Sequence, residues 1–184
     1  MGVEVLAVTD AGFKAEKQVS DIETLLAKNP DILISIPTDP TATAPAYKKA
    51  AEQGQAEGQL NLGIMYKSGK GVDKDLLQAI SWFEKSAVQG NTNAQLNLGV
   101  IYKNKNGLRV DYTKSVYWLK KAVAKDHSSA MTNLGWLYEN GKGVAQDYIK
   151  AAALYKKAAE KGQPEGQLNL GIMYNKGRGV SQDN

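Results

Sequence analysis

The stretch QLNLGIMYKSGKGVDKDLLQAISWFEKSAVQG, residues 59–90, decides the fold because its pattern recurs at a fixed interval. Its opening string aligns without gaps with QLNLGVIY at 95–102, MTNLGWLY at 131–138 and QLNLGIMY at 167–174. The interval is 36 residues, and the shared glycines that mark it are Gly63, Gly99, Gly135 and Gly171. Such strict self-similarity is typical of repeat proteins, in which each unit packs mainly on its neighbours.

Each 36-residue period predicts two helices with a glycine turn between them. The first helices are expected to begin near Ala56, Thr92, Ser128 and Pro164. Aspartates suited to cap the second helices stand at Asp75, Asp111 and Asp147, and glycines suited to end them are Gly54, Gly90 and Gly162. The paired helices of residues 47–184 predict a mainly α fold. Because one such pair cannot bury its own apolar face, the pairs are expected to stack on one another. The expected architecture is an α-solenoid of 36-residue helix-turn-helix repeats, the last of them incomplete.

Residues 1–46 follow a different pattern and predict a small N-terminal βαβ segment. VEVLAV at 3–8 and DILISI at 31–36 are short apolar runs, as in buried parallel strands. Between them, AEKQVSDIETLLAKN has the apolar spacing of a helix. The net charge also divides here, with −4 over residues 1–46 and +8 over residues 47–184.

Catalytic and metal-binding patterns are missing from the sequence. Cysteine is absent, which excludes disulfides, thiolate nucleophiles and thiolate metal ligands. The single histidine, His127, has Gln55, Asn91 and Gln163 as counterparts in other repeats, which favours a polar residue of a surface turn. Neither H-E-x-x-H nor G-x-S-x-G occurs. We therefore expect no enzyme activity, no catalytic residue, no metal site and no cofactor.

One asparagine per unit forms a ladder along the first helices. The ladder and the residues that follow it are the candidate partner-binding residues: Asn61, Ile64, Lys67, Asn97, Val100, Lys103, Asn133, Trp136, Asn169 and Ile172. An asparagine side chain both donates and accepts hydrogen bonds, so it can hold a peptide backbone without demanding one sequence. Trp136 is the best hot-spot candidate, since large aromatics dominate interface energies. The alternative interpretation is that the asparagines are structural and hydrogen-bond between repeats.

The repeated units resemble the Sel-one-like repeat, a relative of the tetratricopeptide repeat. The resemblance rests on the pattern A-x-x-x-L-G-x-x-Y-x-x-G-x-G-V-x-x-D-x-x-x-A-x-x-W and a closing K-A-A-x-x-G, over about residues 47–184. It implies a bacterial scaffold or adaptor that binds a protein or peptide partner in a concave groove. The tyrosines at fixed repeat positions are expected to pack, so no nucleic-acid binding is expected.

Residues 1–54 resemble a fragment of a lobe of periplasmic sugar-binding proteins. The resemblance rests on D-A after the first strand, K-Q-V-S-D-I-E, P-D-I-L-I-S-I-P-T-D and A-Y-K-K-A-A-E-Q-G. It implies Asp10 and Asp39 as residual sugar-loop candidates, although most of a lobe is missing, which favours a capping or linking remnant. Two alternative functions therefore stay open: a remnant sugar-binding protein of an uptake system, and a regulatory repeat fragment of a larger protein.

The two ends of the chain look cut, as in a fragment or a fusion. The last unit has a first helix without a second, so Leu170 and Tyr174 are expected to face solvent on one side and to form a self-association site. The opening MGVEVLAVTD lacks the basic and long apolar regions of a signal peptide. No apolar run approaches the roughly 20 residues of a membrane span. We expect a soluble protein, periplasmic or cytoplasmic.

Overall fold

Among the residues that the structure describes, 40–104 and 109–179, the computed structural model contains helices and no strands. The helices are α2 (Pro40–Glu52), α3 (Ala56–Ser68), α4 (Leu76–Val88), α5 (Thr92–Lys103), α6 (Tyr112–Ala124), α7 (Ser128–Glu139), α8 (Tyr148–Glu160) and α9 (Pro164–Asn175). The mainly α prediction and the repeating helical hairpins are confirmed. The predicted βαβ segment, together with Asp10 and Asp39, lies outside the described residues.

The helix boundaries follow the local signals in each repeat. The first helices begin at the four predicted positions, Ala56, Thr92, Ser128 and Pro164. The N-cap carboxylates of Asp111 and Asp147 accept hydrogen bonds at 2.9 Å from the backbone N–H groups three residues later, and Asp75 accepts from two N–H groups of α4. These bonds satisfy donors that the first turn of a helix leaves without partners.

Left-handed residues separate each second helix from the next unit. Gly54, Gly90 and Gly162 have φ angles of 85°, 95° and 75°, so the predicted glycine stops are confirmed. The repeat at 92–127 carries Asp126 at this place, with φ of 64°. Aspartate tolerates this conformation better than most residues because its short side chain hydrogen-bonds locally.

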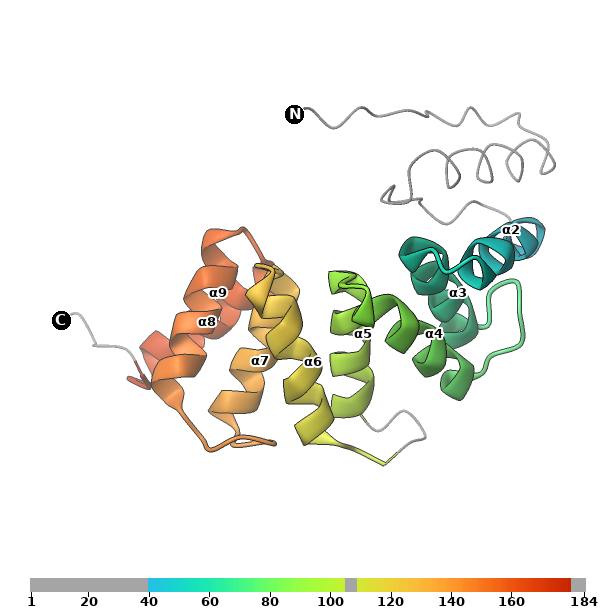
Figure 1. The fold of residues 1–184 in the computed structure, drawn as a ribbon. Helices are drawn as coiled ribbons and strands as arrows, with labels where there is room; N and C mark the ends of the chain where they lie inside the picture. Colours follow the sequence, from blue (N-terminus) through green and yellow to red (C-terminus); the bar gives the residue numbers. More distant parts are fainter. Residues whose placement is uncertain (1–39, 105–108, 180–184) are drawn as a thin grey trace. The chain divides into compact units, whose positions relative to one another are not determined.

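The described residues divide into two compact units, with the boundary between Ser86 and Ala87. In the first unit α2 packs on α3, around Tyr47, Ala50 and Met65. In the second unit each hairpin of a first and a second helix packs on the next, and the first helices α5, α7 and α9 also contact their neighbours in turn (Figure 1). The core of the second unit lies between α6 and α7, around Leu119, Leu134 and Leu137, and continues between α8 and α9.

The repeated glycine of the first helix is the place where a large side chain of the second helix lies. A Cβ atom added at Gly99 would be 2.5 Å from Leu119 Cγ, and one at Gly135 would be 2.7 Å from the ring of Tyr155. In the first unit the same clash, at 2.7 Å, would be with Phe83. Nothing lies within 4 Å at Gly171. The glycines therefore allow close approach of the paired helices, and α9 is the described first helix on which that position is open.

We predict opposite effects of one substitution at two equivalent glycines. Gly135→Ala forces its new methyl group against Tyr155 and is expected to lower the free energy of unfolding by about 1–3 kcal/mol. Gly171→Ala meets no atom and improves helix propensity, so it should raise the free energy of unfolding by up to about 1 kcal/mol. Urea denaturation followed by circular dichroism checks both values. Equal changes in the two variants would contradict this account of the glycines.

Candidate functional site

The face that α5 and α7 present away from their second helices brings predicted partner-binding residues together. Lys103 at the end of α5 donates a hydrogen bond from Nζ to Asn133 Oδ1 on α7, at 2.6 Å. The same ammonium nitrogen lies 5.1 Å from the centroid of the Trp136 ring, which is cation–π distance. We call Lys103, Asn133 and Trp136 the lysine–tryptophan cluster. It joins two consecutive repeats through side chains that are 30 and 33 residues apart in sequence.

The side chain of Lys103 is partly shielded from solvent. Its side chain is half-buried, and this burial lowers the pKa of the Lys103 ammonium group below the usual lysine range. An ammonium group in such a place interacts more strongly with a negative group than one in open water does, because solvent screens it less. The cluster thus combines a positive charge, an amide and a partly exposed aromatic ring.

Two asparagines of the ladder make hydrogen bonds within their own helices. Asn97 Nδ2 donates to the carbonyl oxygen of Asn93 at 2.9 Å, and Asn133 Nδ2 donates to that of Ser129 at 2.8 Å. These bonds, together with the one from Lys103, agree with the structural interpretation of the ladder. An amide oxygen has two lone pairs, so Asn133 Oδ1 keeps one acceptor site beside the lysine. The two interpretations of this residue are therefore compatible.

The candidate residues of the first unit are placed less favourably for a partner. Asn61 on α3 is 4% exposed, and its Nδ2 has no hydrogen-bond partner within the described part of the chain. Its burial removes it from the surface that a partner can reach. Ile64 is half-buried, whereas the Lys67 side chain is exposed. Sequence periodicity could not separate Asn61 from its equivalents, because burial depends on what covers each helix.

The outer face of α9 carries exposed apolar side chains. Leu168, Ile172 and Tyr174 are 64%, 37% and 44% exposed, and Asn169 is half-buried. Tyr174 is exposed as predicted, whereas Leu170 is half-buried and packs with one side against the buried cluster that contains Met173. Sequence analysis missed Leu168. Its equivalent Leu60 is 2% exposed, so the available signal was the repeated apolar position itself.

His127 lies in the turn between two repeats, as expected, but it is half-buried and contacts the preceding repeat. His127 is half-buried at the N-terminal boundary of α7, and its Nε2 lies 3.1 Å from Asn93 Oδ1 on α5. The Nε2–H tautomer makes this hydrogen bond, while Nδ1 is buried without a partner among the described residues. Burial lowers the pKa of His127. The side chain is thus a neutral link between repeats, and no group of three His, Asp or Glu residues in the described ranges could hold a metal.

We predict that His127 makes stability depend on pH. A pKa lowered by folding means that the contribution of His127 is complete above its unfolded pKa of about 6.5 and is lost as the pH falls through the folded value. The reference variant is His127→Gln, because glutamine stands at this position in other repeats and does not titrate. As the pH falls from about 7 to about 5, wild type should lose stability relative to this variant. If the free energies of unfolding of wild type and His127→Gln, measured by urea denaturation, differ by the same amount at every pH, the role assigned to His127 is contradicted.

Comparison with known proteins identifies the repeats. A family model described as Sel1 repeat matches residues 47–55, 56–91, 92–127, 128–163 and 164–184. The structure of a protective antigen of uropathogenic Escherichia coli with an SLR fold is 34% identical, with a TM-score of 0.77 over 92% of this chain. That of a Sel1 repeat protein from Oxalobacter formigenes is 30% identical, with a TM-score of 0.76 over 92% of this chain.

The similar proteins are longer than this chain. It spans 36% and 66% of the two solved structures. A curated relative, the secretory immunoglobulin A-binding protein EsiB of Escherichia coli O6:H1, is 41% identical over 51 residues, which are 28% of this chain and 10% of that protein. No helix in the described ranges is long and apolar enough to cross a membrane. Because the family model covers three quarters of the sequence, the chain belongs to the Sel1 repeat family.

Proposed function

We propose that the chain is a non-enzymatic scaffold that binds a segment of a protein partner on the first-helix face of its second unit. The observation that carries this proposal is the lysine–tryptophan cluster, in which the Lys103 ammonium group contacts both Asn133 and the Trp136 ring. Sel1 repeat proteins generally mediate protein–protein interaction. The proposal assigns that role in this chain to Lys103, Asn133 and Trp136, with Asn97 and Val100 beside them on α5.

The chemistry of the cluster suits a peptide segment with an acidic group. An ammonium group has three donors, and Asn133 uses one of those of Lys103. The others can bind a carboxylate or backbone carbonyl oxygens of a partner. The ring of Trp136 offers apolar area to a neighbouring side chain, and such partly buried aromatics are the usual anchors of interfaces. Sequence features of catalysis are absent, so binding is the activity that we assign.

Secretory immunoglobulin A is the first partner to test. The support is the similarity to a 51-residue part of a protein that is named for binding it. The matching part is only 10% of that protein. The test must therefore distinguish specific binding through the lysine–tryptophan cluster from nonspecific binding to other surfaces of the chain.

We predict that Lys103→Ala with Trp136→Ala weakens partner binding by roughly 30-fold, the loss typical of a hot spot worth about 2 kcal/mol. The matched control is Lys121→Ala with Tyr117→Ala on α6, which removes another lysine whose Nζ lies 5.1 Å from an aromatic centroid. Surface plasmon resonance on immobilised secretory immunoglobulin A measures both variants, and circular dichroism establishes that both stay folded. Equal losses in the two double variants would exclude the lysine–tryptophan cluster as the binding site.

We also propose that the exposed face of α9 associates with a second copy of the chain. Leu168 and Tyr174 lie on this face, where an apolar side chain gains free energy when a partner covers it. Leu168→Gln with Tyr174→Gln should shift the protein toward monomer in sedimentation velocity at high concentration. Leu77→Gln is the control, because Leu77 is equally exposed at 67% on another helix. A wild-type protein that is monomeric at every concentration would refute this association.

A further inference from the structure

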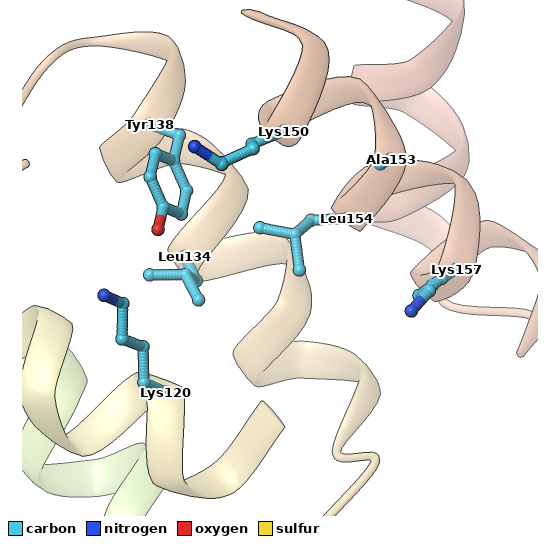
Figure 2. A pocket seen from close by; sticks show the side chains of 7 residues that line it. All are labelled: Lys120, Leu134, Tyr138, Lys150, Ala153, Leu154 and Lys157. Atoms are coloured by element: carbon cyan, nitrogen blue, oxygen red, sulfur yellow. The ribbon is translucent and has the colours of Figure 1, made fainter. Parts of the chain in front are cut away.

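A hollow of about 280 Å³ lies in the second unit, between the second helices α6 and α8 and over the first helix α7. The residues that line it are Lys120, Leu134, Tyr138, Lys150, Ala153, Leu154 and Lys157. In Figure 2, Leu134 and Leu154 lie at its centre, and the three lysines surround them. Leu134 and Tyr138 are four residues apart on one side of α7, whereas Asn133 and Trp136 lie on the other side. The hollow is therefore separate from the lysine–tryptophan cluster.

Two side chains of α8 that line the hollow are smaller than their equivalents in the preceding repeat. Ala153 and Leu154 occupy the repeat positions that Tyr117 and Trp118 fill in α6, which are 36 residues earlier. Trp118 is 8% exposed, and its ring packs edge-on against that of Tyr117 with centroids 4.9 Å apart. A methyl group and an isobutyl group occupy much less volume than the two aromatic rings that they replace. The hollow thus lies where the sequence of this repeat differs from that of the preceding one.

The charge around the hollow is positive and largely unneutralised. Lys150 Nζ is 2.8 Å from a carboxylate oxygen of Asp147, so this lysine is already paired. The side chains of Lys120 and Lys157 are exposed, and no carboxylate of the described residues forms an ion pair with either of them. The position of Lys120 is held by Glu84 one period earlier. Two available ammonium groups therefore flank an apolar floor made by Leu134 and Leu154.

We propose that this hollow binds an organic carboxylate with a small apolar body. The apolar part of this ligand lies against Leu134 and Leu154, and the carboxylate of the ligand lies between Lys120 and Lys157. The volume is just below the range of about 300–1,000 Å³ that is usual for small-molecule sites, so the group that enters is a short chain or a single side chain. Two sources carry this chemistry: a free aliphatic acid, and the C-terminal apolar residue of a peptide with its α-carboxylate.

The binding test uses two matched pairs of probes with the full chain. The first pair is octanoate and 1-octanol, and the second is an acetylated tetrapeptide that ends in leucine, with a free or an amidated C-terminus. In an NMR titration, the backbone amide chemical shifts of residues near Lys120, Leu134 and Leu154 should change saturably. We expect this for octanoate, for the tetrapeptide with a free C-terminus, or for both. Tighter binding of octanoate identifies a free acid as the source, and tighter binding of the tetrapeptide identifies a chain end. Absence of saturable binding by both carboxylates, or equal binding of the neutral probes, overturns the proposal.

Two double variants locate the bound probe. Ala153→Tyr with Leu154→Trp fills the hollow with the residues that α6 already accommodates, and it should abolish saturable binding. Lys120→Gln with Lys157→Gln keeps the floor and should weaken binding about tenfold at low salt, with less salt dependence than wild type. Lys121→Gln, on α6 outside the hollow, is the control and should leave the affinity unchanged. Binding that survives in both double variants would show that the probe lies elsewhere and would overturn the proposal.

Discussion

The contact between a repeated glycine on each first helix and a large side chain of the second helix determines the rest of this structure. At Gly99 and Gly135 the absence of a Cβ atom lets Leu119 and Tyr155 lie directly against the first helix. Both side chains are completely buried, and such burial stabilises the fold by about 1.5–3 kcal/mol per side chain. Glycine costs up to about 1 kcal/mol of helix propensity. The gain from packing exceeds that cost, so the pair can recur in every repeat.

This close packing occupies one side of each first helix and leaves the other side free to vary. On α7, Leu134 belongs to the buried core and Trp136 packs partly against that core, whereas Asn133 accepts a hydrogen bond from Lys103. The polar residues on that side also stabilise the array, because Asn133 accepts from Lys103 of the preceding repeat. Under the proposed function, stability and recognition use the same side chains. This explains why an asparagine can be repeated for structural reasons and still belong to a binding surface.

Differences between repeats, more than their common pattern, create the distinctive features of the second unit. Ala153 and Leu154 in place of an aromatic pair leave the hollow between α6 and α8. His127, in place of glutamine or asparagine, adds a titratable link to Asn93. On α9 the position opposite Gly171 is open, and Leu168 is exposed. Each feature is a local change in a position whose role the neighbouring repeats define.

The sequence by itself determined the period, the helix boundaries and the family of this protein. Asp111 and Asp147 cap helices through N–H groups three residues away, and Gly90 and Gly162 end them through their own backbone angles. These interactions depend only on near neighbours in the chain, so a local pattern is enough to predict them.

Only the tertiary structure decided which of the repeated positions come together in space. The bond from Lys103 to Asn133 spans 30 residues, and that from His127 to Asn93 spans 34. Periodicity treated Asn61 and Asn133 as equivalent, yet Asn61 is buried and Asn133 takes part in the cluster. The physical reason is that exposure and cavity volume depend on the side chains that neighbouring helices contribute, and these differ from one repeat to the next.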